Sequence, residues 1–304
     1  MNREKEKPKI IVVLGPTASG KSDLAVQLAK KISTFSRGAE IISADSRQVY
    51  KGMDIGTGKI TKRGMAGIPH HLLDVKSPKI RFSVSEYQKL ANQTIKKILK
   101  REKTPIICGG TGLYIDAVIE SVAFPDIPPD YRLRKKLEKL PTNELFKKLK
   151  KLDPRRAKNI DKNNPRRLIR ALEIVMISKK PVPEIKKEKN YDVLKIGIKR
   201  QPAELRKLIE KRLIKRIEAG MVKEIKKLRR QGVSWKRLFD FGLEYRWVSL
   251  YLQNKISKSE MFEKLNKAII DYAKRQMTWF KRDKKINWID DFNQASKITK
   301  NFLK

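Results

Sequence analysis

The feature that most constrains the fold is the segment 15–22, which reads Gly-Pro-Thr-Ala-Ser-Gly-Lys-Ser. It fits the pattern G-x-x-x-x-G-K-[ST] of a phosphate-binding loop (P-loop). The loop follows a continuous apolar run at 10–14, which predicts a buried strand, and precedes residues 23–31, whose apolar side chains have helical spacing. A strand, a glycine-rich turn and a helix N-terminus present backbone N–H groups and a positive dipole end to an anion. The sequence therefore predicts a site for a di- or triphosphate.

Two side chains of this loop can bind the ligand in addition to the backbone N–H groups. Lys21 brings a positive charge to the phosphates, and the hydroxyl group of Ser22 can ligate Mg²⁺, which we expect as a cofactor. The loop also permits ATP to bind, because the pattern does not say which phosphate bond breaks. The residues expected to hold the phosphates are Gly15, Pro16, Thr17, Ala18, Ser19, Gly20, Lys21 and Ser22.

Strands and helices alternate in the N-terminal part of the chain. The apolar runs 40–44 and 104–108 predict two further strands, which end at Asp45 and at the Gly-Gly-Thr-Gly sequence that contains Thr111. A helix with a capping box at Ser83 lies between them. This alternation predicts an α/β fold, a P-loop NTPase-like parallel sheet flanked by helices. Because ligands bind beyond the carboxyl ends of such strands, we expect the P-loop, Asp45 and Thr111 to face one crevice.

The composition changes after the third of these strands. A proline-rich break at 124–129 leads into residues 130–178, which read as helices with dense basic residues and no strand signal. A strand pattern returns at 193–198. The predicted domains are a P-loop α/β core formed by 1–123 and 190–304, and an inserted all-helical domain at 124–189.

The charge of the chain indicates a polyanionic partner. There are 73 lysine and arginine residues against 33 acidic residues, which gives a formal net charge of +40. With a P-loop present, nucleic acid is favoured over a membrane as that partner. No apolar run approaches the roughly 20 residues of a membrane span, so we expect no membrane association.

The few cysteines and histidines limit the remaining chemistry. The single cysteine, Cys108, and the adjacent His70 and His71 predict neither a disulfide framework nor a zinc site. We expect Cys108 to be a small buried strand residue and the histidines to pack in a loop. The charged N-terminus leads directly into the first strand, unlike a signal peptide, and a cytoplasmic location is expected.

Five further segments carry motifs of a known protein family. They are 45–57, 68–74, 109–115, 166–173 and 272–280. Together with the P-loop they resemble the tRNA dimethylallyltransferases, also called tRNA isopentenyltransferases or IPP transferases. The most specific matches are Asp-Ser-Arg-Gln-Val-Tyr, which begins the first segment, and Tyr-Ala-Lys-Arg-Gln-Met-Thr-Trp-Phe, which is the last. The resemblance runs from the first strand to about Trp288, and it is to the short bacterial form, which has no Cys/His zinc finger after the core.

This resemblance implies an enzyme that transfers a dimethylallyl group from dimethylallyl diphosphate to tRNA and releases pyrophosphate. The acceptor is N6 of the adenosine immediately 3′ of the anticodon. The P-loop then holds a leaving group, and Lys21 and Mg²⁺ stabilise the charge that builds on it. Asp45 matches the carboxylate that accepts the proton of N6, and Thr111 is placed to bond the base or the diphosphate. Arg212 resembles the family arginine that reaches the diphosphate.

The partner implied by the resemblance is the tRNA anticodon stem-loop, and we expect the enzyme to be a monomer. The stacked target base has to be flipped into a tunnel that dimethylallyl diphosphate enters from the other end. The basic insertion would clamp the stem-loop, with Arg167 and Arg170 on one face of a predicted helix. The residues expected to bind tRNA are Asp45, Ser46, Arg47, Gln48, Thr111, Arg132, Arg166, Arg167, Leu168, Ile169 and Arg170.

Several alternatives remain open from the residues alone. An adenylate isopentenyltransferase would use the same chemistry on free AMP, ADP or ATP, although the basic insertion would then have no partner. The P-loop alone also permits an RNA-associated kinase or NTPase, the charge permits a non-enzymatic RNA-binding protein, and Asp45 is alternatively a second-sphere Mg²⁺ ligand. The segment 242–245 reads Gly-Leu-Glu-Tyr where most family members have Gly-Tyr-Lys-Glu, which leaves the roles of Glu244 and Tyr245 open.

Overall fold

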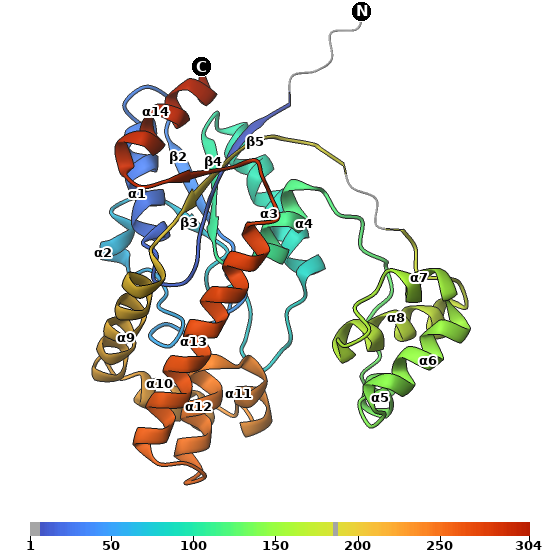
Figure 1. Cartoon of the computed structure of the whole chain (residues 1–304). Coiled ribbons are helices and arrows are strands. Elements are labelled where there is room, and N and C mark those ends of the chain that lie inside the picture. The colour runs from blue at the N-terminus through green and yellow to red at the C-terminus, as the bar shows by residue number, and fades with distance from the viewer. Residues whose placement is uncertain (1–6, 185–187) are drawn as a thin grey trace, which may run out of the picture. The chain divides into compact units, whose positions relative to one another are not determined.

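The computed structural model describes residues 7–184 and 188–304, and its centre is a six-stranded sheet with every strand pair parallel (Figure 1). The strand order is β3-β2-β4-β1-β5-β6. The strands are β1 (Lys9–Leu14), β2 (Ala39–Ser43), β3 (His70–His71), β4 (Thr104–Gly109), β5 (Asp192–Ile198) and β6 (Ile286–Ile289). The sheet confirms the predicted fold class. The interpretation of the charged N-terminus concerns residues 1–9, of which residues 1–6 lie outside the described part.

Helices cover both faces of this sheet. One face packs against α1 (Lys21–Ile32) and α14 (Phe292–Leu303), and the other against α3 (Val84–Lys100) and α4 (Gly112–Ile119). Alternate residues of β1 point to opposite faces and belong to two separate hydrophobic clusters. The predicted capping box at Ser83 is present at the start of α3. Because the sheet is parallel, the loops that follow β1, β2 and β4 lie at one edge of it.

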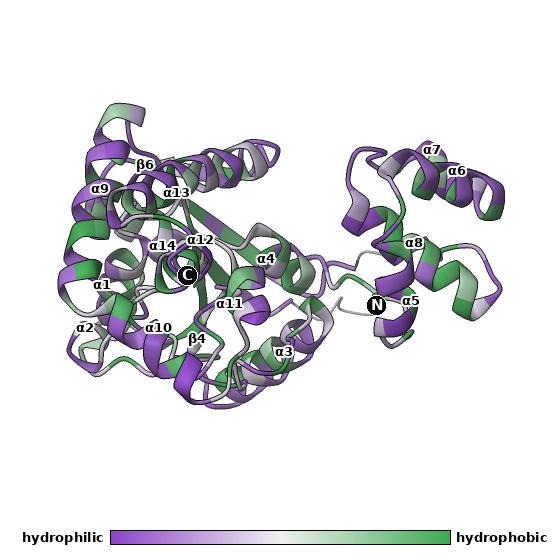
Figure 2. Ribbon diagram, turned by 90° about the horizontal axis from the view of Figure 1, so that it is seen from below, coloured by the Kyte–Doolittle hydropathy of each residue, from purple (hydrophilic) through white to green (hydrophobic). Residues whose placement is uncertain are grey.

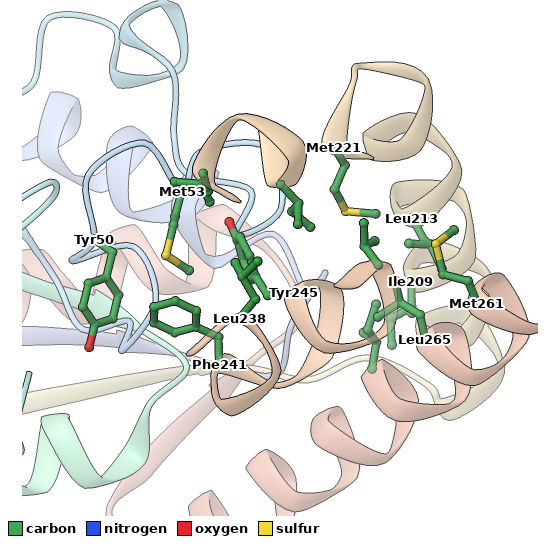
Figure 3. Packing of buried hydrophobic residues seen from close by; sticks show 14 of the residues in the cluster. Tyr50, Met53, Ile209, Leu213, Met221, Leu238, Phe241, Tyr245, Met261 and Leu265 are labelled. Carbon is green, nitrogen blue, oxygen red and sulfur yellow. The ribbon is translucent and has the colours of Figure 1, made fainter. Parts of the chain in front are cut away.

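A third hydrophobic cluster lies beyond that edge, among five helices. They are α9 (Pro202–Glu218), α10 (Met221–Arg230), α11 (Trp235–Phe241), α12 (Leu243–Leu252) and α13 (Lys258–Phe280). The segment after β2 enters this cluster through Tyr50 and Met53. The ring of Phe241 packs edge-on against those of Tyr50 and Tyr245, as Figure 3 shows. The helices thereby anchor the segment that carries the most specific family motif.

The chain divides into two compact units, Met1–Ser121 with Lys189–Lys304, and Val122–Glu188. The sequence analysis placed the insertion at 124–189, a range that includes residues 185–187, which the structure does not describe. The second unit contains the helices α5 (Tyr131–Leu137), α6 (Thr142–Leu152), α7 (Pro154–Lys158) and α8 (Pro165–Ser178). They enclose a hydrophobic cluster of their own, and each shows hydrophilic residues beside hydrophobic ones in Figure 2.

The short helix α2 (Lys62–Met65) completes the set of helices. Within the described residues, no helix combines the length and the apolar character that crossing a membrane requires.

Candidate active site

The P-loop joins β1 to α1 and relies on two of its glycines. Gly20 caps α1 with a left-handed backbone at φ 93°, a conformation that a residue without a Cβ atom adopts readily. Gly15 provides space, because a Cβ atom there would lie 2.9 Å from Ser19 Oγ and 3.2 Å from the backbone oxygen of Ile198. The loop thus presents the N-terminus of a helix of 12 residues, the geometry that favours a bound anion.

A cavity of about 570 Å³ lies beside this loop, between α1, the ends of β2 and β4, α9 and α13. The predicted site residues that line it are Thr17, Ala18, Gly20, Lys21, Ser22, Asp45, Gln48 and Arg212. Other predicted site residues of the core support the loops around the cavity without lining it, and they are Gly15, Pro16, Ser19, Ser46, Arg47 and Thr111. The structure therefore brings the proposed leaving-group site and the proposed base into one cavity.

Two positive groups of this cavity, Lys21 and Arg212, form no ion pair within residues 7–184 and 188–304. Lys21 Nζ donates to the backbone oxygen of Pro16 at 3.2 Å, and Arg212 Nη2 to that of Gly58 at 3.4 Å. Burial, and then the charge of Arg212, lowers the pKa of Lys21 to about 8. Burial, and then the charge of Arg216, lowers the pKa of Arg212 to about 10. Uncompensated and partly desolvated positive charge of this kind attracts a polyanion.

The carboxylate of Asp45 is half-buried at the end of β2. Its Oδ1 accepts hydrogen bonds from the backbone N–H groups of Arg47 at 2.8 Å and Gln48 at 3.3 Å. Asp45 makes no ion pair in the part of the chain that the structure describes, so its carboxylate remains able to accept a proton from a ligand in the cavity.

Thr111 and Tyr272 flank this carboxylate from two other elements. Thr111 Oγ1 accepts a hydrogen bond from the backbone N–H of Ser46 at 3.1 Å and thus holds the segment that follows Asp45. Tyr272, on α13, lines the cavity, and its hydroxyl group lies close to Asp45 and Thr111. Burial raises the pKa of Tyr272 to about 12, so its phenol keeps its proton near neutral pH and can donate it to a ligand.

Sequence reasoning missed the residues that hold the loop 54–58 over the cavity. The carboxylate of Glu224 accepts hydrogen bonds from the backbone N–H groups of Asp54 at 2.9 Å, Ile55 at 2.6 Å and Gly56 at 3.1 Å. It also accepts one from the hydroxyl group of Tyr245 at 2.9 Å. Glu224 lies far along the chain from this loop, and no local pattern marks it as a partner.

The altered motif at 242–245 finds its explanation in the same region. Tyr245 donates to Glu224, and the buried Glu244 pairs with Arg216 at 2.8 Å. Burial raises the pKa of Glu244, and Arg216 acts in the opposite direction. Both residues therefore support the loop and the arginines beside the cavity. In the sequence, Glu244 and Tyr245 stand out because the segment 242–245 departs from the family pattern.

The remaining core residues singled out in the sequence have packing roles. Arg47 Nε donates to the backbone oxygen of Phe241 at 2.8 Å, and its contact with RNA stays a prediction. Cys108 is buried in β4. The two histidines form β3 instead of lying in a loop, with His71 Nε2 bonded to the carboxylate of Glu40 at 2.7 Å.

In the helical unit, the predicted RNA-binding residues differ in exposure. Arg132, Arg166 and Arg167 are exposed. Leu168 and Ile169 are buried in the core of the unit, so their predicted RNA contact is not available to their side chains, and they instead fix α8. The side chain of Arg170 is bonded within the unit, to Glu173 at 2.5 Å and to the backbone oxygen of Ile127 at 2.9 Å. An internal partner therefore competes with RNA for Arg170, and its RNA contact stays a prediction.

No group of three or more His, Cys, Asp and Glu side chains that could hold a metal ion occurs within the described residues. The hydroxyl group of Ser22 is exposed, and the carboxylates of Asp23 and Asp45 line the same cavity. These few oxygen donors fit Mg²⁺ if phosphate oxygens supply further ligands, which is how this ion is usually bound.

The comparisons with known proteins agree on one family. The sequence pattern of the IPP transferases matches residues 48–283. A tRNA dimethylallyltransferase of Pelobacter propionicus is 42% identical over 291 residues, which cover 92% of this chain and 89% of that protein. A tRNA isopentenylpyrophosphate transferase of Bacillus halodurans aligns with a TM-score of 0.72 at 36% identity and covers 98% and 96% of the two chains. A eukaryotic dimethylallyltransferase acting on tRNA aligns with a TM-score of 0.83 at 25% identity, over 97% and 79%. The chain belongs to the tRNA dimethylallyltransferase family.

Proposed function

We propose that this enzyme transfers the dimethylallyl group of dimethylallyl diphosphate to N6 of the adenosine immediately 3′ of the anticodon in tRNA. The observation that carries the proposal is the single cavity that Lys21, Arg212 and Asp45 line. It combines a positive site for a diphosphate with a carboxylate able to accept a proton. A kinase can combine the same two features, and the similarity to tRNA dimethylallyltransferases favours transfer to a nitrogen nucleophile instead.

The diphosphate is expected to lie against the P-loop and the N-terminus of α1. Lys21 and Arg212 then stabilise the negative charge that develops as the bond between the allylic carbon and oxygen breaks. Ser22 would hold Mg²⁺ together with phosphate oxygens, and Asp23 lines the same cavity as a further oxygen donor. The ion would supply further charge stabilisation to the leaving group.

The adenine amino group is a weak nucleophile, because its lone pair is delocalised into the ring. A bond forms between N6 and the allylic carbon while pyrophosphate leaves, and N6 then gives up one proton. Asp45 is the proposed acceptor of that proton. Tyr272 lines the cavity beside it and can orient the base by a hydrogen bond, and Thr111 holds the segment that follows Asp45.

The proposed partner is the anticodon stem-loop, whose target base has to leave the stack to reach such a cavity. The net charge of +40 suits a polyanion of that size. The exposed Arg132, Arg166 and Arg167 of the helical unit are the proposed clamp. We further propose that the enzyme acts as a monomer in the cytoplasm, where tRNA is its substrate.

The test is incubation of the protein with radiolabelled dimethylallyl diphosphate, Mg²⁺ and either unmodified tRNA or AMP. We expect the label to appear in tRNA, and we expect the labelled nucleoside to be the one immediately 3′ of the anticodon. Label in AMP instead of tRNA would identify an adenylate isopentenyltransferase. Phosphate release from ATP without any labelled acceptor would favour the kinase or NTPase interpretation.

A further inference from the structure

Gln276 connects the two ends of the cavity. It lies on α13, is only 6% exposed and lines the cavity. Its Oε1 accepts a hydrogen bond from the backbone N–H of Thr17 at 2.8 Å, and its Nε2 donates one to the backbone oxygen of Gly110 at 2.8 Å. One buried amide group thus satisfies a donor in the P-loop and an acceptor in the loop after β4.

The two loops that Gln276 joins belong to opposite partners of the proposed reaction. Thr17 lies in the loop that faces the diphosphate. Gly110 precedes Thr111, whose Oγ1 accepts from the N–H of Ser46, the residue after Asp45. Three hydrogen bonds, joined by the covalent links between Gly110 and Thr111 and between Ser46 and Asp45, therefore connect the leaving-group site through Gln276 to the proton acceptor.

The residues around the side-chain amide of Gln276 restrict its position. A Cβ atom at Gly110 would lie 2.2 Å from Nε2 of Gln276, so the glycine is needed for the amide to come this close. Tyr272, one helical turn earlier on α13, lines the same cavity and lies close to Thr111. The helix α13 therefore acts on the base side of the cavity through two side chains and on the diphosphate side through Gln276.

We propose that Gln276 is a positioning residue for the transfer reaction, which fixes the separation between the diphosphate site and Asp45. This inference rests on the proposed function. Reacting atoms have to meet at about 3–3.5 Å, and a misplacement of about 1 Å can lower the rate about 100-fold. Gln276 touches neither reacting atom in this account and acts through the two loops.

The first test replaces Gln276 by methionine, which has a similar length and lacks both hydrogen-bonding groups. We expect Gln276→Met to lower kcat for tRNA prenylation about 100-fold and to leave KM for both substrates within about threefold. The matched control is Thr278→Ala on the same helix, an exposed residue whose hydroxyl group bonds only to its own helix at Lys274. A kcat of Gln276→Met within about threefold of the wild-type value, in a folded protein, would overturn the inference.

The second test keeps the inference falsifiable if the methionine variant does not fold. A protonated glutamic acid has the same donor and acceptor arrangement as glutamine, whereas its carboxylate cannot donate to Gly110. We expect kcat of Gln276→Glu, relative to wild type at each pH, to rise as the pH is lowered, at temperatures where both proteins are folded. A ratio that does not change with pH would contradict the positioning role. Absence of tRNA prenylation by the wild-type protein is a different result, which would overturn the proposed function and this inference with it.

Discussion

Each unit of the molecule contains a cluster of two arginines and one buried glutamate, and the two clusters differ in how many of their arginines bond to the carboxylate. In the helical unit, Glu173 accepts hydrogen bonds from Arg134 at 2.7 and 2.8 Å, from Arg170 at 2.5 Å and from the N–H of Asp130 at 2.7 Å. Burial alone would raise the pKa of Glu173, and these hydrogen bonds lower it below the usual range. Both arginines of this cluster are bonded within the unit.

The cluster of the α/β unit is built differently. Within residues 7–184 and 188–304, Glu244 forms an ion pair only with Arg216, and Arg212, on the same helix, has one hydrogen bond, to the backbone oxygen of Gly58 at 3.4 Å. Arg212 lines the cavity with Lys21, and burial lowers the pKa of both. The comparison teaches that the same residue types stabilise a fold where both arginines bond to the carboxylate, and prepare a site where one arginine stays unpaired among the described residues and faces a cavity.

The largest effect is expected at the carboxylate that shares the cavity with Arg212. Asp45→Asn keeps the acceptor for the N–H groups of Arg47 and Gln48, and should lower the single-turnover rate by about 10²–10⁴, the range typical of a general base. Asp54→Asn is the control, because that carboxylate is exposed and its side chain pairs only with Lys59. A loss of less than about tenfold would refute the role of Asp45 as base. Recovery with added Mg²⁺ would instead identify a metal ligand.

A substitution in the cluster of the helical unit should change the stability of the protein and leave donor binding unchanged. Glu173→Gln leaves Arg134 and Arg170 without a counter-charge. We expect a loss of about 2–3 kcal/mol of unfolding free energy, less than for a fully buried pair because the arginines are partly exposed. Denaturant titration followed by circular dichroism measures it, with the exposed Glu138→Gln as the control. An unchanged midpoint would show that this cluster does not stabilise the helical unit.

The exposed arginines of α8 should affect only the RNA substrate. Arg166→Ala or Arg167→Ala should weaken binding of the anticodon stem-loop by about tenfold or less and reduce the slope of log affinity against log salt by about one. The affinity for dimethylallyl diphosphate should not change. Equal affinity of variant and wild type at every salt concentration would show these arginines to be a solvated face.

The smallest effect is a pH dependence of donor binding. With a pKa of about 8 in the free protein, Lys21 is protonated below that pH and loses its charge above it. The affinity for dimethylallyl diphosphate should therefore fall about twofold between pH 7 and pH 8. Lys21→Arg should remove this dependence. Arg212→Gln should move it to higher pH, because it removes a repelling charge.

Much of the fold follows from local sequence signals. The apolar runs that end at the P-loop, at Asp45 and before Thr111 form three adjacent central strands, β1, β2 and β4, because strands buried on both faces are continuously apolar. Their carboxyl ends then meet at one edge, so the common crevice of the P-loop and Asp45 could be predicted as well.

The supporting contacts could not be predicted in this way, because they depend on tertiary structure. Gln276 lies 259 residues from Thr17, and neither residue has a local feature that indicates their bond. Arg167 and Arg170 share a predicted helix face, yet of these two residues Arg170 is the one that bonds to Glu173. Burial of Leu168 and Ile169 likewise depends on the other helices of the unit, so a run that resembles an RNA-binding motif also contains core residues.

The most direct test of this account compares one arginine from each cluster. Arg212→Gln and Arg170→Gln remove the same charge, and calorimetry with dimethylallyl diphosphate and a thermal melt are carried out on both proteins. We expect Arg212→Gln to weaken donor binding by about 10- to 100-fold, as loss of a charge-assisted hydrogen bond does, with little change of the melting temperature. We expect Arg170→Gln to lower the melting temperature and leave donor binding unchanged. Equal effects of the two variants on donor affinity would contradict the assignment of the unpaired arginine to the site and of the paired arginine to the fold.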